Sequence, residues 1–315
     1  MVARVFIDGE AGTTGLQIRE RLAMRRDLEL ISIPEESRKE LSARADCLNK
    51  ADIAILCLPD AAAKESVALI ENDTTRVIDA SSAHRVADGW AYGFAEMDLD
   101  QGDVIAAAMR VTNPGCWPQG LIAAVRPLVA AGLLPADFNL TYHGISGYSG
   151  GGKGMIADYD ALGASANVFA PYALGFNHKH LPEMTEYGLL DGAPLFTPSV
   201  GNYYKGMLTV VPLNLAGLAR VPTGAEIHAA LADHFTATGG FVEVAPLEAL
   251  ERSDSLDPQA LNDTNSLRLQ VFANDARAQA AIVAVYDNLG KGASGAAVQN
   301  LNLMLGVDQT TSLAA

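Results

Sequence analysis

Short β-branched runs alternate with longer helix-forming stretches through the first hundred residues of this 315-residue chain. We expect strands at residues 3–8, 28–33, 52–56, 76–79 and 104–107, and helices that begin near Gly12, Ser37, Ala61 and Trp117. Each intervening helix connects two strands that run in the same direction, so the sheet must be parallel and covered on both faces. The alternation predicts a doubly wound α/β domain at residues 1–115.

The pattern changes near Pro114. We expect helices at residues 117–131 and 224–235, and strands at 138–145, 195–200, 206–213, 241–244, 267–273 and 280–286. This order favours a mixed sheet flanked by helices, in a second, α+β domain at residues 116–286. Two domains agree with the limit of about 250–300 residues on a single core. A last amphipathic helix is expected at residues 294–305, and its periodicity does not indicate where it packs.

The chain has 37 acidic and 22 basic residues, a formal net charge of −15 at pH 7. Such a surface repels nucleic-acid phosphates and anionic lipids, so we expect neither nucleic acid nor membrane as a partner. No apolar run reaches the roughly 18 residues of a membrane span, and the N-terminal residues lack a secretion signal. Three cysteines at irregular spacing fit neither a disulfide framework nor a zinc module. These features favour a cytoplasmic protein.

Gly9, Gly12 and Gly15 follow the first expected strand and open the first helix. Without a Cβ the chain can turn tightly at Gly9, and a pyrophosphate can approach the backbone at Gly12. The helix then presents the free N–H groups of its first turn, around Thr13 and Thr14, to the phosphates. The spacing GxxGxxG predicts a Rossmann-type dinucleotide site, with a glycine turn that binds no ligand as the alternative.

The segment after the second strand bears on the choice between NAD and NADP. An NAD enzyme typically places an acidic residue there to bind the ribose 2′-OH. Here residues 34–39 read Pro-Glu-Glu-Ser-Arg-Lys. Ser37 and Arg38 could hold a 2′-phosphate, so we favour NADP, while Glu35 and Glu36 keep NAD open.

Cys116 lies in the sequence Asn-Pro-Gly-Cys-Trp-Pro, directly before an apolar helical stripe. At the N-terminus of a helix the dipole favours the thiolate, which is the nucleophilic form. The alternative is a buried structural cysteine, the interpretation that we give to Cys47 and Cys57. The prolines and the glycine indicate a sharply held turn, so we interpret Cys116 as a catalytic nucleophile.

His178 and His180 belong to the densest cluster of titratable side chains, at residues 178–183. Thiolate chemistry needs an acid or base that works near neutral pH, the role for which histidine is suited. Metal binding is the rival interpretation, but no further ligand is spaced to complete a site, so we expect no metal. We interpret the other four histidines as structural or surface residues; they are His84, His143, His228 and His234.

A glycine-rich loop is expected at residues 146–154. It nearly matches a Walker A motif, but Gly154 stands where Mg²⁺ needs a hydroxyl group. This disfavours a phosphate-hydrolysing enzyme. The loop N–H groups could still cradle a phosphate or an acyl oxygen, with Lys153 adding charge, or the loop could be mere flexible filler.

Taken together, these residues resemble the short-form N-acetyl-γ-glutamyl-phosphate reductases of arginine biosynthesis, which are relatives of aspartate-semialdehyde dehydrogenase. The resemblance covers nearly the whole chain, and the cysteine, histidine and C-terminal motifs in one order are highly specific. The motifs lie at residues 9–15, 79–85, 94–97, 113–116, 146–150, 178–183 and 287–300. Two departures are Trp117, where the family often has Tyr, and Phe94-Ala95-Glu96, where a Pro-Glu pair is common.

The resemblance implies an NADP-dependent oxidoreductase that forms a thioester on Cys116, reduces it to an aldehyde, and works as a homo-oligomer, a dimer or tetramer. Residues 116–286 would be the catalytic and dimerisation domain, and residues 287–315 a C-terminal helix that returns to the first domain. Further cofactor contacts would come from Gly292, Ala293, Ser294, Gly295 and Asn300. Candidates for binding the substrate are Ser81, Arg85, Asn113, Ser149, Lys153 and Glu183. Of these, Arg85, Ser81 and the loop with Ser149 and Lys153 are the candidates for its phosphate or carboxylate. Either His178 or His180 could transfer the proton, and we favour His180.

Three other functions compete with this prediction. A sister acyl-phosphate reductase would act on aspartyl phosphate or an aminoadipyl phosphate. A cofactor-free Cys/His hydrolase or acyltransferase would leave the glycine motif unexplained. A nucleotide-sensing protein on a dehydrogenase fold would show no turnover.

Overall fold

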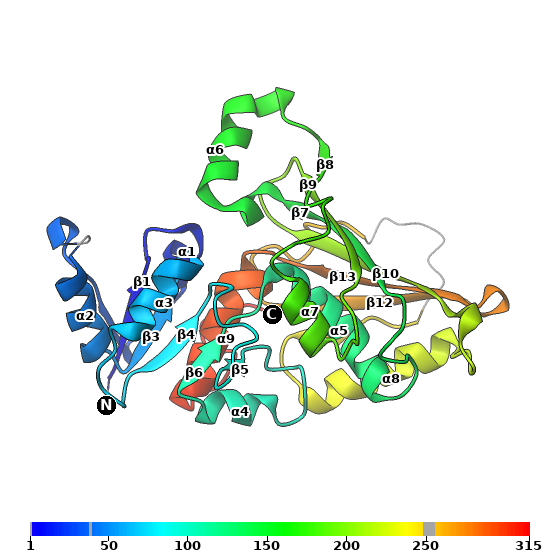
Figure 1. Cartoon of the computed structure of the whole chain (residues 1–315), viewed down its shortest axis with the longest axis horizontal. Helices are drawn as coiled ribbons and strands as arrows, with labels where there is room; N and C mark the ends of the chain where they lie inside the picture. Colours follow the sequence, from blue (N-terminus) through cyan, green and yellow to red (C-terminus); the bar gives the residue numbers. More distant parts are fainter. Residues whose placement is uncertain (1, 38–39, 248–255) are drawn as a thin grey trace. The chain divides into compact units, whose positions relative to one another are not determined.

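The computed structural model describes residues 2–37, 40–247 and 256–315 (Figure 1). The chain forms two compact units. The first unit comprises residues 1–95, 100–115 and 293–313, and the second comprises residues 96–99, 116–292 and 314–315. The expected two-domain α/β architecture is therefore confirmed.

The first unit is built on a six-stranded parallel sheet in the order β2-β1-β3-β4-β6-β5. The strands are β1 (Ala3–Asp8), β2 (Leu28–Ile31), β3 (Ile53–Leu56), β4 (Arg76–Asp79), β5 (Ala91–Tyr92) and β6 (Arg110–Thr112). All four residues of β3 are buried, as expected for a central strand with both faces covered. The strand order reverses between β1 and β3, the point at which doubly wound sheets bind ligands.

Helices cover both faces of this sheet. They are α1 (Thr13–Leu22), α2 (Leu41–Lys50), α3 (Asp60–Ala68), α4 (Gln101–Ala107) and α9 (Gly295–Leu305), with a 3₁₀ turn at Glu35–Ser37. Ile18 of α1, Ile105 of α4 and Leu301 of α9 belong to one apolar cluster. Leu48 of α2 and Ala63 of α3 belong to the other. The C-terminal helix thus returns to the first unit, as expected, and packs against α1 and α4.

The boundaries of the units differ from the expected ranges of 1–115, 116–286 and 287–315. Residues 96–99 belong to the second unit, and this unit extends to Gly292. Both differences involve one buried ion pair, because Glu96 binds Lys291 within the second unit. Local sequence patterns carry no signal for a contact between segments so far apart.

The strand expected at residues 104–107 is wrong. These residues lie in α4, where Ile105 is buried in the core and Val104 is exposed. A short apolar run fits a strand or a buried helical turn equally well, so periodicity could not decide. The strand at this place in the sheet is β6, three residues further on, and the Asn-Pro-Gly-Cys turn follows it directly. The helix expected from Ser37 begins instead at Leu41.

The second unit contains a seven-stranded mixed sheet in the order β11-β12-β13-β10-β7-β9-β8. The strands are β7 (Thr141–Gly147), β8 (Phe169–Pro171), β9 (Leu195–Gly201), β10 (Met207–Asn214), β11 (Val242–Val244), β12 (Leu267–Asn274) and β13 (Gln279–Tyr286). The pairs β7–β9 and β11–β12 are parallel, and the other pairs are antiparallel. The mixed sheet predicted from the sequence is confirmed.

Helices α5 (Cys116–Ala130), α7 (Leu181–Tyr187) and α8 (Gly224–Thr238) belong to this unit. Helix α5 packs against α7 and α8 and onto β10, β12 and β13. Strand β10 alternates accordingly, with Met207, Thr209 and Val211 buried and Leu208 and Val210 only half-buried on the opposite face. That opposite face is apolar and partly open.

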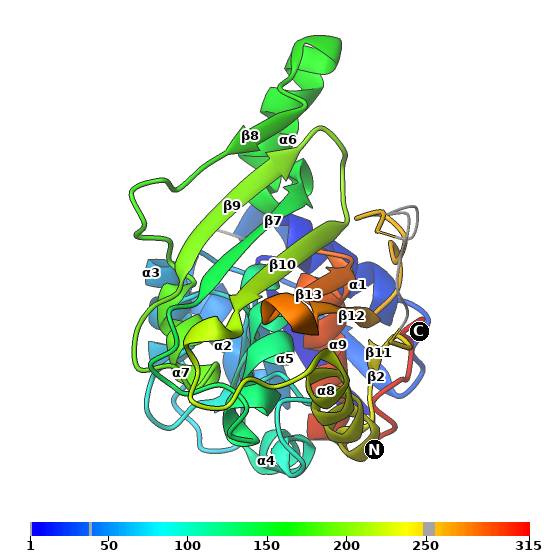
Figure 2. The same cartoon turned by 90° about the vertical axis from the view of Figure 1, so that its right-hand side faces the viewer.

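Helix α6 (Gly152–Leu162) and strand β8 project beyond the rest of this sheet (Figure 2). The residues expected as a glycine-rich loop, 146–154, form the end of β7, a 3₁₀ turn at Tyr148–Gly151 and the start of α6. No residue of α6 is buried. Shorter turns lie at Gly163–Ser165, Leu215–Gly217 and Asp275–Arg277, and a π-helical turn lies at Gly290–Ser294. Across the described ranges, no helix has both the length and the apolar character needed to cross a membrane.

Candidate active site

Cys116 is the first residue of α5, and the sheet holds this first turn from below. The phenol of Tyr286, at the end of β13, donates to the Cys116 carbonyl at 2.7 Å, and Tyr142 of β7 donates to the Trp117 carbonyl at 2.7 Å. Gly120 makes room for both phenols, because a Cβ there would lie 2.8 Å from Tyr286 Oη and 2.9 Å from Tyr142 Oη. The helix N-terminus that carries the thiol therefore has a fixed position.

Three phenols lie within electrostatic reach of Cys116. Burial raises the pKa of Tyr142, Tyr172 and Tyr286, and negative charge on Cys116 contributes to the increase in each case. All three therefore remain protonated hydrogen-bond donors at neutral pH. By contrast, burial raises the pKa of Cys57 to about 12, which keeps that thiol neutral.

The two histidines of the cluster are in contact at the start of α7. His180 is buried in the position before the helix, and its ring centroid lies 4.6 Å from that of His178. The His180 backbone N–H donates to His178 Nδ1 at 3.2 Å. A ring that accepts at Nδ1 is neutral and carries its proton on Nε2. While this bond holds, His178 is thus confined to one neutral tautomer.

An aromatic cluster links the histidines to the residue next to Cys116. Trp117 Nε1 donates to Tyr172 Oη at 2.9 Å, and the Tyr172 ring centroid lies 5.9 Å from that of His178. Phe196 of β9 contacts both His178 and Trp117 edge to face, with centroids 5.2 and 5.3 Å apart. The sequence did not single out Tyr172, which follows β8, or Phe196 of β9, since an aromatic residue in or beside a strand is an ordinary core feature.

The π-helical turn at Gly290–Ser294 brings part of the C-terminal motif to the cysteine. A Cβ on Gly292 would lie 3.0 Å from Cys116 Cβ, so the two backbones meet there without space for a side chain. Gln119, one turn further along α5, donates from Nε2 to the Lys291 carbonyl at 2.7 Å. Gly292, one of the residues expected to contact the cofactor, is thus in contact with Cys116 within the second unit.

The remaining predicted residues of the second unit differ in their environments. Glu183 is buried in the first turn of α7. Ser149 is buried, and its hydroxyl accepts from Asn288 Nδ2 at 3.0 Å. Lys153 is exposed on α6.

In the first unit, the three motif glycines shape the loop after β1. Gly9 has φ +89°, and a Cβ there would lie 2.4 Å from the Cys57 carbonyl oxygen. A Cβ on Gly15 would lie 2.5 Å from the Gly9 carbonyl oxygen, so the loop can pack this tightly only with glycine. Gly12 precedes Thr13 and Thr14, which begin α1, and no side chain caps this helix. The loop therefore fits a dinucleotide pyrophosphate, which would meet open backbone and a helix N-terminus.

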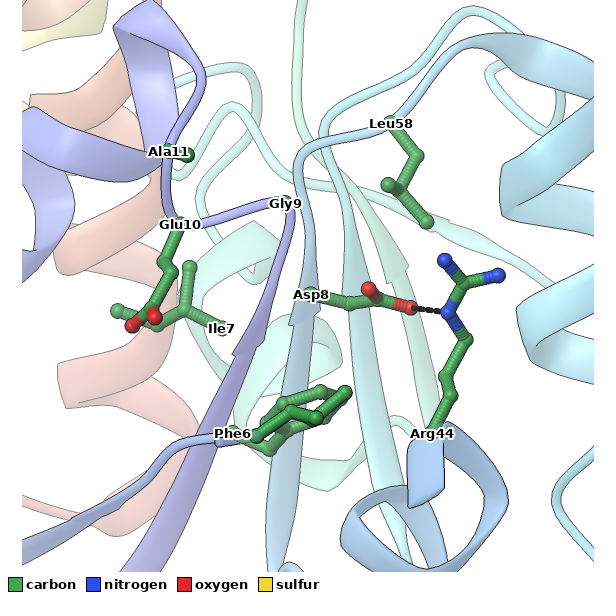
Figure 3. Close-up of a pocket in the computed structure, with 9 residues that line it drawn as sticks. Phe6, Ile7, Asp8, Gly9, Glu10, Ala11, Arg44 and Leu58 are labelled. Atoms are coloured by element: carbon green, nitrogen blue, oxygen red, sulfur yellow. Dashed lines mark ion pairs between the residues drawn. The ribbon is translucent and has the colours of Figure 1, made fainter. Parts of the chain in front are cut away.

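A pocket lies beside this loop (Figure 3). It is lined by Phe6, Ile7, Asp8, Gly9, Glu10, Ala11, Ile33, Arg44 and Leu58. Arg44 Nε lies 3.4 Å from Asp8 Oδ2, which also accepts from Ser66 Oγ at 2.7 Å. Burial raises the pKa of Asp8, and the hydrogen bond from Ser66 and the positive charge of Arg44 act in the opposite direction. Apolar walls with a few polar groups, here Arg44 and the carboxylates of Asp8 and Glu10, suit the adenosine end of a dinucleotide.

The segment proposed to select NADP is only partly described. Ser37 closes the 3₁₀ turn after β2, whereas Arg38 lies outside the described residues. Ser32, at the end of β2, accepts from Arg19 Nη1 at 2.9 Å and donates to Glu10 Oε2 at 3.2 Å.

Asn113, just before the cysteine turn, connects several other predicted residues of the first unit. Its Nδ2 donates to the Ala293 carbonyl at 3.0 Å, and its Oδ1 accepts from Asn300 Nδ2 at 3.1 Å. Arg85 Nε donates to the Asn113 carbonyl at 3.2 Å. The amide of Asn300 is fully buried and also donates to the Gly93 carbonyl. This network connects the first-unit parts of three sequence motifs.

Two predicted hydroxyl groups bind protein partners nearby. Ser81 Oγ donates to Asp79 Oδ2 at 2.8 Å, and the same carboxylate oxygen lies 2.6 Å from His84 Nδ1. Ser294 Oγ donates to Gln17 Oε1 at 3.0 Å, and Gly295 begins α9 directly after it.

Residues 4–104 match the family model of the semialdehyde dehydrogenase NAD-binding domain, and residues 116–288 match that of the semialdehyde dehydrogenase dimerisation domain. Two relatives are named N-acetyl-γ-glutamyl-phosphate reductase. The one from Mesorhizobium japonicum is 66% identical over 308 residues, which cover 98% of this chain and 100% of the relative. The one from Brucella anthropi is 53% identical over 311 residues, which cover 97% and 99%.

Solved structures of aspartate semialdehyde dehydrogenases share the fold. Enzyme II from Vibrio cholerae gives a TM-score of 0.70 at 16% identity, covering 97% of this chain and 99% of that one. The Candida albicans enzyme, solved with NADP, gives 0.68 at 14% identity, with coverage of 97% and 99%. At these identities the likeness concerns the fold alone.

We expect Gly9→Ala to destabilise the first unit and to abolish dinucleotide binding, because the new Cβ would meet the Cys57 carbonyl. Gly89→Ala is the matched control, since Gly89 has φ +79° but open space around it. Backbone strain alone costs about 1–3 kcal/mol, so Gly9→Ala should exceed the control by about 2 kcal/mol or more. Urea unfolding and NADPH titration measure both effects, and equal losses in the two variants would contradict the steric argument.

Proposed function

This chain belongs to the N-acetyl-γ-glutamyl-phosphate reductase family, a group of oxidoreductases, and we propose that it reduces N-acetyl-γ-glutamyl phosphate to N-acetylglutamate semialdehyde. The electron donor would be NADPH, and the pathway arginine biosynthesis. The observation that carries this proposal is the position of Cys116 at the N-terminus of α5, coupled through aromatic side chains to the histidine pair. A sister acyl-phosphate reductase remains the alternative, because it would use the same groups.

Cys116 supplies the nucleophile. Its thiolate, favoured by the α5 dipole, attacks the acyl carbon, the new C–S bond replaces the C–O bond to phosphate, and phosphate leaves. Backbone N–H groups of the first α5 turn stabilise the oxyanion that forms in this step. Bound NADPH supplies a hydride for the resulting thioester. Collapse of the thiohemiacetal then releases the aldehyde and restores the thiol.

A proton must reach the oxygen that becomes the thiohemiacetal hydroxyl, and we assign it to His180. His178 accepts a hydrogen bond at Nδ1 and stacks edge-on against Phe196, which suits a residue that orients its neighbour and the substrate. The same hydrogen bond does not fix the tautomer of the His180 ring, because His180 contributes its backbone N–H to this bond and not a ring nitrogen. Histidine in this role typically contributes about 10²–10⁴-fold to the rate.

The anionic groups of the substrate need donors from this acidic chain. We propose Arg85 and Asn113 together with Ser81 in the first unit, and Ser149 and Lys153 in the second. Glu183, whose carboxylate only accepts hydrogen bonds, would instead bind a donor group of the substrate. Arg85 is the strongest candidate, because its guanidinium is nearly buried and bonded to backbone carbonyls, so its charge is held in place.

We propose NADP rather than NAD as the cofactor. Arg44 lines the pocket beside the glycine loop, and Ser37 lies in the turn after β2. Gly9, Gly12 and Gly15 with Thr13 and Thr14 would hold the pyrophosphate, and residues 292–295 the nicotinamide end. A reduced thiol is needed at Cys116, and Cys47, Cys57 and Cys116 are all outside disulfides. This supports a cytoplasmic location, which cell fractionation would test.

We further propose that a second copy of the chain covers the open face of the mixed sheet. A cavity of about 340 Å³ on this face is lined by Ile145, Phe169, Leu208 and Val210, among others. Val168, just before β8, and Phe169, its first residue, are 79% and 57% exposed, and α6 has no buried residue. Exposed apolar side chains gathered on one face mark an interface.

Sedimentation should therefore show a dimer or tetramer, and Val210→Asp should shift the equilibrium towards monomer by placing a charge in the apolar face. Val86→Asp is the control, because Val86 is a half-exposed residue of the first unit. This variant should not change the oligomeric state. A monomeric wild-type chain at micromolar concentration would contradict the proposal.

We expect phosphate-dependent reduction of NADP when N-acetylglutamate semialdehyde is supplied, and much slower reaction with aspartate semialdehyde or with NAD. Cys116→Ser should lower kcat at least about a thousandfold, because a hydroxyl is a far weaker nucleophile, while the Kd for NADPH stays unchanged. Absorbance at the NADPH band follows turnover, and fluorescence titration follows binding.

Cys47→Ser is the matched control for this variant, since Cys47 is a half-buried free thiol on α2 and should tolerate the change. A preference for aspartate semialdehyde would instead support the alternative function, a sister acyl-phosphate reductase. Wild-type turnover by Cys116→Ser would refute the nucleophile assignment.

The two histidine variants should change different kinetic constants. His180→Asn should lower kcat by about 10²–10⁴-fold and remove an imidazole ionisation from the pH–rate profile. His178→Asn should mainly raise KM, because asparagine Oδ1 can still accept the His180 N–H. The reverse pattern would assign proton transfer to His178.

A further inference from the structure

Two buried charges of the second unit meet beside the turn that contacts Cys116. Lys291 and Glu96 are each 1% exposed. Lys291 Nζ lies 2.8 Å from both carboxylate oxygens of Glu96. The Phe241 N–H donates to Glu96 Oε1 at 2.9 Å, and the Phe241 ring centroid lies 5.7 Å from Lys291 Nζ. At this degree of burial the pair is not placed to touch a substrate.

The backbone around Glu96 is shaped to receive its carboxylate. Gly240 has φ +85°, and a Cβ there would lie 2.6 Å from Glu96 Oε1. The Glu96 carbonyl also lies 3.1 Å from His234 Nε2 of α8. Glu96 is therefore anchored to α8 and to the segment that follows it, and it offers Lys291 a fixed partner.

Lys291 connects the anchored Glu96 carboxylate with the turn that contacts Cys116. Its carbonyl accepts from Gln119 of α5, and the next residue, Gly292, lies against Cys116 Cβ. The Gly292 N–H donates to the Asp287 carbonyl at 2.9 Å. The turn is thus held by the Lys291 side chain, which binds Glu96, and by two hydrogen bonds to its backbone, at the Lys291 carbonyl and the Gly292 N–H. Cys116 contacts the turn at Gly292.

Stability alone does not explain such a pair. Desolvation of two charges consumes much of their attraction, and apolar side chains of the same shape often stabilise a core as well or better. What the charges add is a specific partner, because Lys291 Nζ lies 2.8 Å from both oxygens of a carboxylate that the Phe241 N–H also holds, and this favours one position of the lysine.

We propose that Lys291 and Glu96 are positioning residues that hold Gly292 against Cys116 and so set the orientation of the thiol for attack. This inference deepens the proposed function and rests on Cys116 as its nucleophile. The contact at Cβ restricts the χ1 rotamers open to the cysteine. A displacement of about 1 Å at a reacting atom can cost about a hundredfold in rate.

The test uses the double variant Glu96→Gln/Lys291→Met, which removes both charges and preserves the approximate shape, so that no unpaired charge remains buried. Two readouts are measured on the full chain: kcat, and the limiting rate constant at high pH for alkylation of Cys116 by iodoacetamide, followed by peptide mass mapping. We expect kcat to fall about tenfold to a hundredfold, the limiting alkylation rate to fall several-fold, and KM values to stay within about twofold.

The matched control is Asp98→Asn/Arg126→Met. Arg126 Nε binds Asp98 Oδ1 at 3.0 Å and joins the same 96–99 segment to α5, but ten residues beyond Cys116. This variant should lower the Tm without changing kcat or alkylation. A Glu96/Lys291 variant that lowers only the Tm, like the control, would overturn the proposal.

If the double variant fails to fold, Glu96→Gln alone decides, since it retains acceptors for Phe241 and Lys291 and weakens only the charge. Unchanged alkylation in that variant would overturn the proposal, and slower alkylation would support it. The alkylation readout needs no substrate, so it remains informative even if the wild-type chain does not reduce N-acetyl-γ-glutamyl phosphate.

Discussion

The first turn of α5 is the constraint on which the second unit depends. Two phenols bind its carbonyls from the sheet, and the turn at Gly290–Ser294 meets it from another side. Each contact needs a residue without a side chain, Gly120 for the phenols and Gly292 for the turn. Because the thiol is carried on the helix N-terminus, the same contacts that place the backbone also direct the helix dipole at the sulfur. Packing and reactivity therefore have one structural cause.

In the first unit, too, a close contact of the backbone depends on a glycine. Strand β1 ends in a loop that can close on the carbonyl of Cys57, directly after β3, only because Gly9 lacks a Cβ. The parallel sheet brings the carboxyl ends of β1, β3 and β4 to one edge, where the glycine loop and the buried Asp79 lie. Close backbone approach, rather than a particular side chain, prepares this edge for phosphates.

Sequence patterns predicted the layers of both units, because a buried parallel strand and an amphipathic helix leave periodic signals. They failed where a segment is short or glycine-rich: residues 104–107 are helical, and α6 begins inside an expected loop. The motifs predicted roles for Cys116 and the two histidines from residue type and spacing, and these roles stay predictions. The partners of these residues, Tyr172 and Phe196, and the pairing of Glu96 with Lys291 depend on tertiary contacts, for which local patterns carry no information.

The order in which the chain is made has a consequence for how the first unit folds. Its sheet is complete by Thr112, yet the helix that covers Ile105 and Ile78 is α9, which begins at Gly295. A ribosome therefore releases this face of the sheet covered only by α1 and α4, and it must synthesise residues 116–292 before α9 emerges. During that interval the exposed apolar face is a natural substrate for chaperones. A chain that stopped at Gly292 would keep that face open to aggregation for as long as it existed.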